Sequence, residues 1–127
     1  MARKILLVDD DRVNRLLTQT ILEELGYEVE VLADGRGAAD AVATGGFEAI
    51  AMDCQMPHVD GFEATAEIRR RQAKEHGIRT PIIGLSARAM RGDEEVALTR
   101  GMDAYVTKPV SVRKLQVALE QVLGKQD

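Results

Sequence analysis

The sequence predicts a single α/β domain whose parallel sheet is covered by helices on both faces. Three observations carry this prediction. The 127 residues fit one compact domain. Short apolar runs of strand length alternate five times with stretches that have helical spacing. Glycines follow several of the helical stretches, where they end helices. Alternation of this kind is typical of a doubly wound parallel sheet.

The first half of the chain is expected to form three strands and two helices. Apolar residues at helical spacing predict a helix over 12–25, which Gly26 ends. Alternation of polar and apolar residues predicts a strand over 28–32. An alanine-rich stretch predicts a second helix over 36–44, ended by two glycines. Two short apolar runs, 5–8 and 49–52, complete this half as buried strands.

The second half continues the alternation after a loop over 54–61. Its expected elements are a helix over 62–73, a strand over 82–85, a helix over 90–100, a strand over 104–106 and a helix over 112–123. One basic run, Arg69 to Arg71, lies near the end of the third helix. We interpret this run as the solvated end of that helix.

The composition argues against several classes of function. The formal net charge is −4, the pI is about 5.2 and only 3% of the residues are aromatic, unlike most nucleic-acid-binding proteins. Cys54 is the single cysteine, so no disulfide forms within the chain. The first apolar run ends at Val8 and is too short for a signal peptide or membrane anchor. We expect a cytoplasmic protein that contacts neither nucleic acid nor membrane.

Polar side chains follow most of the predicted strands. Asp9 and Asp10 follow the first strand, Asp53 the third, Ser86 the fourth, and Lys108 lies just past the fifth. The carboxyl ends of parallel strands meet at the edge where open α/β sheets bind ligands. If the first and third strands are neighbours, the three carboxylates converge, and each raises the pKa of the others unless a cation intervenes. Mg²⁺ suits such a site, because it takes few carboxylates and keeps water positions open.

An ammonium and a hydroxyl beside such an ion make a site for a phosphoryl group. A carboxylate in the same site can attack phosphorus and form an aspartyl phosphate. Taken singly, the residues have ordinary interpretations: Asp11 as a helix N-cap, Lys108 as a solvated surface lysine and Ser86 as a cap. The joint arrangement, with each group after a different strand, favours the phosphoryl site.

At this point the sequence resembles the receiver domain of two-component response regulators, over the whole chain from 1 to 127. The resemblance rests on Leu7-Val8-Asp9-Asp10, Met52-Asp53-Cys54-Gln55-Met56-Pro57, Asp60-Gly61, Pro81-Ile82-Ile83, Ser86-Ala87 and Lys108-Pro109. It implies a flavodoxin-like sheet in the order 2-1-3-4-5. It also implies a partner histidine kinase or histidine phosphotransfer protein as the phosphoryl donor. Such a domain is a signalling phosphoacceptor and no enzyme, apart from limited self-phosphorylation and self-dephosphorylation.

The resemblance assigns the acidic residues their roles. Asp53 is the phosphoacceptor. Asp10 binds Mg²⁺ directly, and Asp9 assists, through water. Asp53 itself and the main-chain carbonyl of Cys54 complete the protein ligands of the metal.

The resemblance also assigns the groups that contact the phosphoryl oxygens. Ser86 and the amide of Ala87 donate hydrogen bonds, and Lys108 contributes its ammonium. A cis bond precedes Pro109, as proline permits. Tyr105 is the aromatic switch residue that swings inward when Ser86 moves toward the phosphate. Its ordinary interpretation is a half-buried tyrosine of a strand.

Finer features relate the chain to a subset of the family. The sequence of residues 52–57 is most like that of receivers in hybrid histidine kinases. The runs Phe62-Glu63-Ala64-Thr65 and Val13-Asn14-Arg15 point the same way. The chain is therefore expected to be a stand-alone regulator or the receiver segment of a hybrid kinase. Its readout face is expected over 90–100, 104–106 and 112–123. Gln55 and Arg88 fall at positions that vary in the family and influence the loss of the phosphoryl group, and Gly84 is expected to loosen its strand.

Other functions remain open from the residues alone. A mononucleotide-binding flavodoxin-like protein would use a glycine-rich loop, but the candidate Gly35-Arg36-Gly37 follows the second strand and has no third glycine. A hydrolase acting on outside substrates would need an insertion to enclose them. A degenerate receiver could act through protein contacts alone. His58 and His76 are far apart in sequence, and we interpret both as surface residues.

Overall fold

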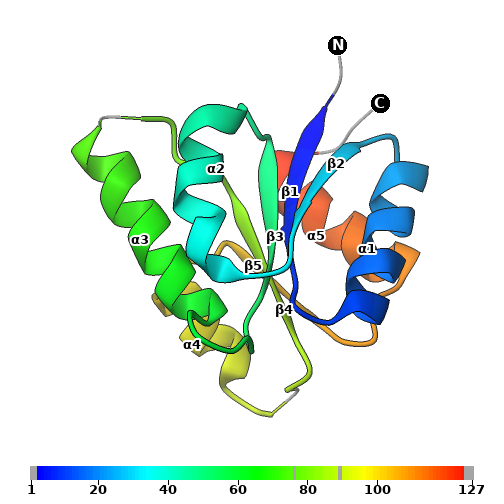
Figure 1. Cartoon of the computed structure of the whole chain (residues 1–127). Helices are drawn as coiled ribbons and strands as arrows, with labels where there is room; N and C mark the ends of the chain where they lie inside the picture. Colours follow the sequence, from blue (N-terminus) through cyan, green and yellow to red (C-terminus); the bar gives the residue numbers. More distant parts are fainter. Residues whose placement is uncertain (1–2, 76, 89, 125–127) are drawn as a thin grey trace.

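The computed structural model describes residues 3–75, 77–88 and 90–124, in which strands and helices alternate along the chain (Figure 1). The strands are β1 (Lys4–Val8), β2 (Glu28–Leu32), β3 (Ala49–Asp53), β4 (Ile82–Ser86) and β5 (Ala104–Thr107). The α-helices are α1 (Arg12–Glu24), α2 (Ala38–Gly45), α3 (Gly61–Lys74), α4 (Asp93–Thr99) and α5 (Val112–Leu123). A 3₁₀ turn, η1 (Gly35–Gly37), precedes α2.

The five strands form one parallel sheet in the order β2-β1-β3-β4-β5, which confirms the predicted fold class and strand order. The chain moves outward from β1 to β2, and then crosses back to β3 on the other side of β1. This reversal makes β1 and β3 neighbours, and their carboxyl ends are adjacent. The switch point that binds ligands in open α/β sheets therefore lies between these two strands.

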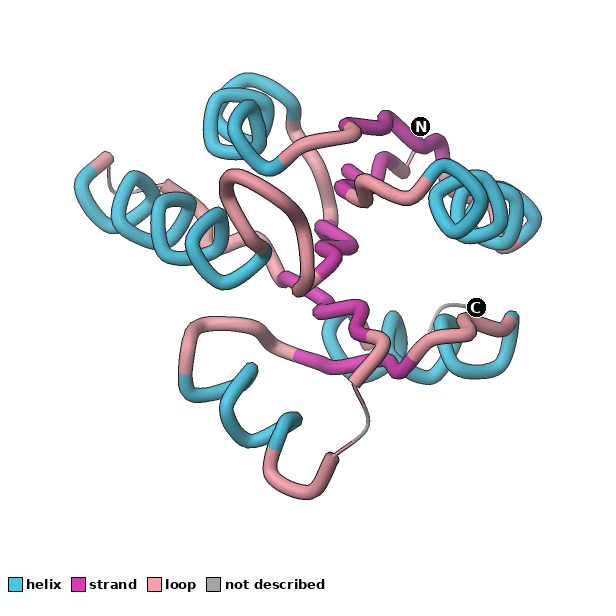
Figure 2. Tube along the Cα trace, turned by 60° about the horizontal axis from the view of Figure 1, so that its bottom comes forward, coloured by secondary structure: helices cyan, strands magenta, loops and turns pink. Residues whose placement is uncertain are grey.

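Helices cover both faces of the sheet (Figure 2). Helices α1 and α5 pack on one face, over a core that includes Ile5, Leu7, Leu22 and Leu115. Helices α2, α3 and α4 pack on the other, over a core that includes Leu6, Val8, Ala39, Ile68 and Ala97. Successive residues of β1 thus enter opposite cores, as the two-residue repeat of a strand requires.

Burial follows the position of each strand in the sheet. Every residue of β3 and β4 is buried, whereas β2 lies at the edge and is largely exposed or half-buried. Gly84 of β4 leaves space that Met102 fills, because a Cβ there would lie 2.6 Å from Met102 Sδ and 3.3 Å from Cys54 Sγ. The glycine thus makes room for a large neighbour in this buried strand.

Two predicted helices begin at the wrong residue. The helix expected over 36–44 is an η1 turn followed by α2, and Asp34 caps the turn by accepting from the Arg36 amide. The helix expected over 90–100 begins only at Asp93, because Gly92 adopts a left-handed conformation with φ of 91°. A residue in that conformation cannot continue a right-handed helix. The other elements agree with the prediction to within one or two residues.

Helix α1 exposes much of its apolar sequence. Val13 is 74% exposed and Leu16 62% exposed, whereas Ile21 and Leu22 are buried. The apolar spacing correctly predicted a helix, but only its second half turns this spacing toward the core. No described helix has the length and apolar character needed to cross a membrane.

The basic run of α3 is only partly solvated, so the prediction of a solvated helix end is wrong for Arg69. Its side chain is 16% exposed, and its guanidinium lies 2.7 Å from Asp103 Oδ2. It also donates to the Gly101 and Thr80 carbonyls, at 3.0 and 2.7 Å. Arg71 pairs with Asp40 on α2 at 2.6 Å, and Arg70 is exposed as predicted.

Candidate functional site

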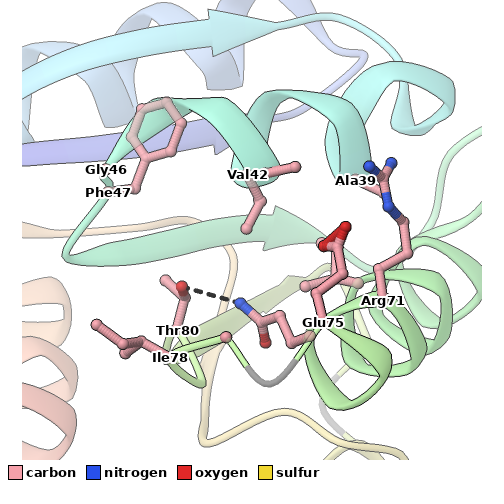
Figure 3. A pocket seen from close by; sticks show the side chains of 12 residues that line it. Ala39, Val42, Gly46, Phe47, Arg71, Glu75, Ile78 and Thr80 are labelled. Atoms are coloured by element: carbon pink, nitrogen blue, oxygen red, sulfur yellow. Dashed lines mark hydrogen bonds between the residues drawn. The ribbon is translucent and has the colours of Figure 1, made fainter.

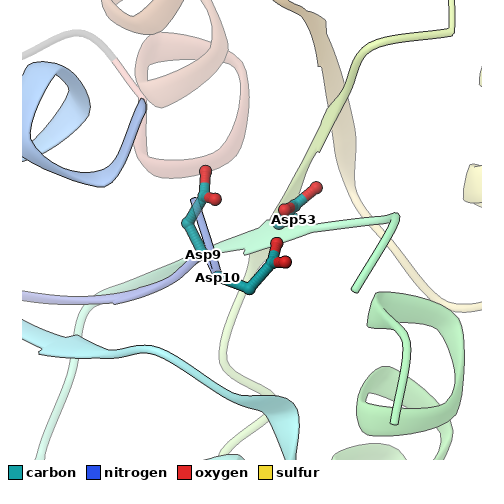
Figure 4. A group of neighbouring side chains, drawn as sticks. All are labelled: Asp9, Asp10 and Asp53. Carbon is teal, nitrogen blue, oxygen red and sulfur yellow. The ribbon is translucent and has the colours of Figure 1, made fainter. Parts of the chain in front are cut away.

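The predicted carboxylates meet where β1 and β3 end (Figure 4). Val8 and Met52 are partners in the parallel register, so the next residues, Asp9 just after β1 and Asp53 at the end of β3, lie side by side. Oxygen atoms of Asp9, Asp10 and Asp53 lie within 4.8 Å of one another. The pairing of the two strands therefore produces the acidic cluster expected from the sequence.

The three carboxylates differ in their surroundings. Asp9 and Asp53 are buried, at 0% and 1% exposure, whereas Asp10 is exposed. The Asp11 amide donates to Asp9 Oδ1 at 2.9 Å, and the Gln55 amide donates to Asp53 Oδ1 at 3.1 Å. Each buried carboxylate is thus oriented by the main chain that follows it, which leaves its other oxygen for a different partner.

Lys108 reaches the same site from the end of β5. Its main-chain amide donates to the Ser86 carbonyl at 2.7 Å, which extends the pairing of β4 with β5. Its ammonium lies 3.2 Å from Asp9 Oδ2 and 3.4 Å from Asp53 Oδ1. The bond between Lys108 and Pro109 is cis, as predicted.

A second lysine holds the segment that carries Lys108. The Lys114 ammonium, in the first turn of α5, donates to the Thr107 and Pro109 carbonyls, both at 3.1 Å. These carbonyls flank Lys108 in the chain, so Lys114 fixes the main chain on either side of it. Sequence reasoning missed this positioning role, because Lys114 looks like any exposed helical lysine.

The charges of the site are strongly coupled. Burial, and next the Asp9 carboxylate, raise the pKa of Asp53 to about 7, and Lys108 offsets only part of this rise. Burial lowers the pKa of Lys108, but Asp53 and Asp9 outweigh it and leave that pKa raised. Two buried carboxylates beside one ammonium still carry excess negative charge, which a further cation would neutralise.

The donor set fits a hard divalent cation. Asp9 Oδ2 is buried and, among the described residues, has no hydrogen-bond partner beyond its ion-pair contact with Lys108. The exposed carboxylate of Asp10 leaves one side of the cluster open to water, as Mg²⁺ requires. The Cys54 carbonyl accepts from the Gly61 amide at 3.2 Å, and its second lone pair remains for a ligand. The cluster is therefore consistent with the predicted metal ligands.

Ser86, the last residue of β4, is fully buried and lies under the side chain of Gln55. Gln55 Nε2 donates to Ser86 Oγ at 2.9 Å, and Ser86 Oγ lies 3.2 Å from Gln55 Oε1. The Ala87 amide also donates to Gln55 Oε1, at 3.2 Å. The resemblance had marked Gln55 as a variable position that influences loss of the phosphoryl group, but its contact with Ser86 and the Ala87 amide was not predicted.

Tyr105 lies on β5 and is half-buried. Its hydroxyl donates to the Arg88 carbonyl at 2.8 Å, in the segment after β4. The tyrosine therefore contacts the same segment that carries Ser86 and Ala87. This contact agrees with the ordinary interpretation of a strand tyrosine, and it joins β5 to the segment expected to move.

Other residues singled out from the sequence lie where expected or outside the described residues. Asp11 caps α1 by accepting from the Val13 amide at 3.2 Å. His58 is exposed, as predicted, and His76 lies outside the described residues. Arg15, which the sequence marked only as part of a similarity, donates to the Asp9 carbonyl at 2.9 Å and so helps to fix the acidic loop.

A separate hollow of about 290 Å³ lies between α2 and α3 (Figure 3). Val42, Phe47, Ile78 and Thr80 are among the residues that line it. Phe47 and Thr80 precede β3 and β4, so this hollow lies at the amino edge of the sheet, opposite the acidic cluster. It holds none of the residues predicted for the site.

A family model for the response regulator receiver domain matches residues 5–120. Among curated proteins, the sensor histidine kinase GacS of Pseudomonas protegens is 42% identical over 120 residues. These cover 94% of this chain, which spans only 13% of that kinase. The hybrid signal transduction histidine kinase I of Dictyostelium discoideum is 38% identical over 128 residues, covering 97% of this chain and 7% of that protein.

Solved structures agree with this family assignment. The receiver domain of sensor histidine kinase PA1611 from Pseudomonas aeruginosa, with a magnesium ion coordinated in its active site cleft, is 41% identical, with a TM-score of 0.84. That match covers 98% of this chain and 100% of the other. The receiver domain of Ssk1 from Saccharomyces cerevisiae, crystallised with the phosphotransfer protein Ypd1, has a TM-score of 0.83 at 25% identity, covering 99% and 95%. The chain therefore belongs to the response regulator receiver domain family.

Proposed function

We propose that residues 1–127 form a receiver that accepts a phosphoryl group on Asp53 and signals through the resulting change in conformation. The observation that carries the proposal is the position of Asp53, buried at the end of β3 between two acids and an ammonium 3.4 Å away. A carboxylate in this position is oriented to act as a nucleophile, and the charged groups that the reaction needs already surround it.

In the proposed transfer, Asp53 takes the phosphoryl group from a phosphohistidine. An oxygen of Asp53 forms a bond to phosphorus while the bond between phosphorus and the histidine nitrogen breaks, and that nitrogen keeps the electron pair. Lys108 contacts one phosphoryl oxygen, and Ser86 and the Ala87 amide donate to another. These groups stabilise the negative charge that the three phosphoryl oxygens carry in the transition state.

Mg²⁺ is the proposed cofactor, with Asp10 as a direct ligand, Asp9 through water, and Asp53 and the Cys54 carbonyl completing the set. Bound there, it would supply positive charge next to the phosphoryl oxygens. The buried Oδ2 of Asp9, which among the described residues contacts only the Lys108 ammonium, supports this assignment, as does the magnesium ion of the related PA1611 receiver. Asp53 must be ionised to attack phosphorus, and a cation in the cluster favours that form.

The proposed donor is a histidine kinase or a histidine phosphotransfer protein. Sensor kinases such as GacS are among the curated relatives, and the related Ssk1 receiver was crystallised with the phosphotransfer protein Ypd1. The proposed chain is either a stand-alone regulator or the receiver segment of a hybrid kinase. The donor is charged from ATP, so the proposed location is the cytoplasm.

The proposed readout face comprises α4, β5 and α5. It exposes apolar side chains in water, with Val96 49% and Val117 46% exposed. A shallow hollow of about 390 Å³ beside Tyr105 is lined by residues of α4, β5 and α5. Since Tyr105 also contacts the segment after Ser86, a shift of that segment would reach this face directly.

The same geometry argues against the other candidate functions. A degenerate receiver would lack part of the acid, hydroxyl and lysine set, which is complete here. A mononucleotide-binding protein would need a phosphate cradle, but the Gly35–Gly37 segment forms a 3₁₀ turn beside the edge strand β2. The domain is thus proposed as a phosphoacceptor with only slow self-dephosphorylation, and no outside substrate.

Intact mass after incubation with acetyl phosphate and Mg²⁺ tests the proposal. We expect one phosphoryl adduct on the wild type and none on Asp53→Asn, with strong loss of the adduct in Asp10→Ala or in EDTA. Asp11→Asn is the matched control, because asparagine can also cap α1 and the change removes one neighbouring charge. An equal adduct on Asp53→Asn would contradict the phosphoacceptor assignment.

A further inference from the structure

The side chain of Gln55 engages the two groups proposed to bind the phosphoryl oxygens. Its Oε1 accepts from the Ala87 amide at 3.2 Å and lies at hydrogen-bonding distance, 3.2 Å, from the Ser86 hydroxyl. Its Nε2 lies 2.9 Å from the same hydroxyl. Thus one amide side chain engages both hydrogen-bond donors at the end of β4.

A phosphoryl group on Asp53 would need those same two donors. Phosphoryl oxygens only accept hydrogen bonds, and so does Gln55 Oε1. The Ala87 amide has a single hydrogen and the Ser86 hydroxyl has one, so neither can serve both acceptors fully. Occupation by Gln55 and occupation by a phosphoryl oxygen are therefore alternatives.

Building on the proposed function, we propose that Gln55 is an internal competitor for the phosphoryl site, which must release Ser86 and Ala87 before the phosphoryl group can engage them. It stabilises the resting state by accepting from the Ala87 amide and by hydrogen bonding to the Ser86 hydroxyl. It thereby weakens phosphoryl binding without contacting phosphorus. Gln55 is thus a positioning residue that influences how readily Ser86 and the Ala87 amide bind the phosphoryl group.

The position of Gln55 allows this exchange. Gln55 is exposed and lies in the segment between β3 and α3, where no helix fixes its side chain. Its main-chain amide is held by Asp53 Oδ1 at 3.1 Å, so the side chain can turn away while the backbone keeps its place. The released amide then hydrogen-bonds to water, which costs little. Ser86 also accepts from the Arg88 amide at 3.0 Å, a contact that does not use its hydroxyl hydrogen.

Beryllofluoride, which binds a carboxylate as a phosphoryl mimic, provides the test. Its apparent affinity in the presence of Mg²⁺ is measured by ¹⁵N–¹H NMR titration of the wild type, Gln55→Ala and Gln55→Met. Methionine keeps the length of the side chain but lacks the amide. Gln116→Ala removes an equivalent exposed glutamine from α5 and serves as the matched control.

We expect both Gln55 variants to bind beryllofluoride about three- to tenfold more tightly than the wild type, as the loss of roughly one net hydrogen bond predicts. In the free protein, the Ala87 amide resonance should shift in both variants, and Gln116→Ala should match the wild type. Equal or weaker binding by the Gln55 variants would overturn the proposal. Tighter binding of beryllofluoride by Gln55→Ala but not by Gln55→Met would also overturn it, because the size of the side chain would then be the cause.

The two readouts separate this inference from the function on which it rests. If the wild type binds beryllofluoride and takes up phosphate on Asp53 while the variants are unchanged, only the competition is wrong. If neither the wild type nor any variant binds beryllofluoride or takes up phosphate, the phosphoacceptor assignment fails as well. Thermal unfolding by circular dichroism verifies that each variant is folded before titration.

Discussion

At the scale of single residues, the site places two buried carboxylates beside one ammonium group. Asp9 and Asp53 are each almost fully buried, and Lys108 offers one positive charge between them. Burial and the Asp9 carboxylate raise the pKa of Asp53 to about 7. The folded protein thus holds Asp53 in an environment that disfavours its charge until a cation arrives.

This conflict predicts a pH-dependent gain in stability for Asp53→Asn. The folded pKa of Asp53 is raised above its unfolded value, so its contribution to stability is fully present below pH ~4 and is lost as pH rises through about 7. In EDTA we therefore expect Asp53→Asn to be more stable than the wild type at pH 8, by about 2 kcal/mol, and to show a clearly smaller advantage at pH 5. Urea unfolding at both pH values measures the difference.

Magnesium supplies the control for this prediction. Mg²⁺ should stabilise the wild type at pH 8 far more than it stabilises Asp53→Asn, because the variant lacks one of the three converging carboxylates. An advantage of equal size at pH 5 and pH 8 would point to a cause other than the titration of Asp53.

At the scale of elements, the turn from β3 into α3 positions the site. Helix α3 begins at Gly61 with a capping box, in which the Asp60 side chain accepts from the Glu63 amide and Glu63 accepts from the Asp60 amide. Gly61 packs directly against the end of β3, where an added Cβ would lie 2.2 Å from the Asp53 carbonyl oxygen. The helix therefore supports the main chain of Asp53, the proposed phosphoacceptor.

This close approach predicts that Gly61→Ala destabilises the fold and distorts the site. The new methyl group would also lie 2.8 Å from the Cα of Cys54, and main-chain atoms cannot move aside cheaply. We expect a loss of about 2 kcal/mol in urea unfolding, together with slower phosphate uptake. Gly37→Ala is the matched control, since a Cβ added at Gly37 would meet nothing within 4 Å, and it should be close to neutral. Wild-type stability in Gly61→Ala would refute the tight contact.

At the scale of the whole molecule, the carboxyl and amino edges of the sheet carry different groups of charged residues. The carboxyl edge carries the acids, Ser86 and Lys108, where charges are left in conflict. At the amino edge, Arg69 joins α3 to the segments before β4 and β5 through Thr80 and Asp103. Asp103 also pairs with Arg79 and accepts from the Ile82 amide at 2.8 Å. This network gives the Asp103 carboxylate two guanidinium partners and joins α3 to the segments before β4 and β5.

This division predicts that Arg69→Ala lowers stability without changing the chemistry of the site. Removing the guanidinium takes one of two arginine partners from Asp103 and leaves the Thr80 carbonyl without its donor, which should cost roughly 1–3 kcal/mol. Arg70→Ala, an exposed neighbour on the same helix, should cost little. Urea unfolding measures the stability, and phosphate uptake per folded molecule should match the wild type. A loss of uptake at full folding would contradict the separation of the two edges.

Much of the molecule could be predicted from the sequence because its signals are local. Apolar spacing distinguishes strand from helix, and Val112–Leu123 was predicted with its observed bounds. The alternation of the two element types implies a parallel sheet, and parallel strands bring their carboxyl ends to one edge. Asp9, Asp53, Ser86 and Lys108 could therefore be assigned to one site from their order along the chain.

How those residues meet depends on tertiary packing, which local signals do not specify. The burial of Arg69 and the cover that Gln55 places over Ser86 depend on contacts between segments far apart in sequence. So does the exposure of Val13 and Leu16, whose helical spacing alone suggested a face toward the core. Periodicity specifies the type of an element, but which side chain fills which space depends on packing in three dimensions. The order of residues along the chain thus specifies which groups share the site, and the packing determines which of them Gln55 contacts.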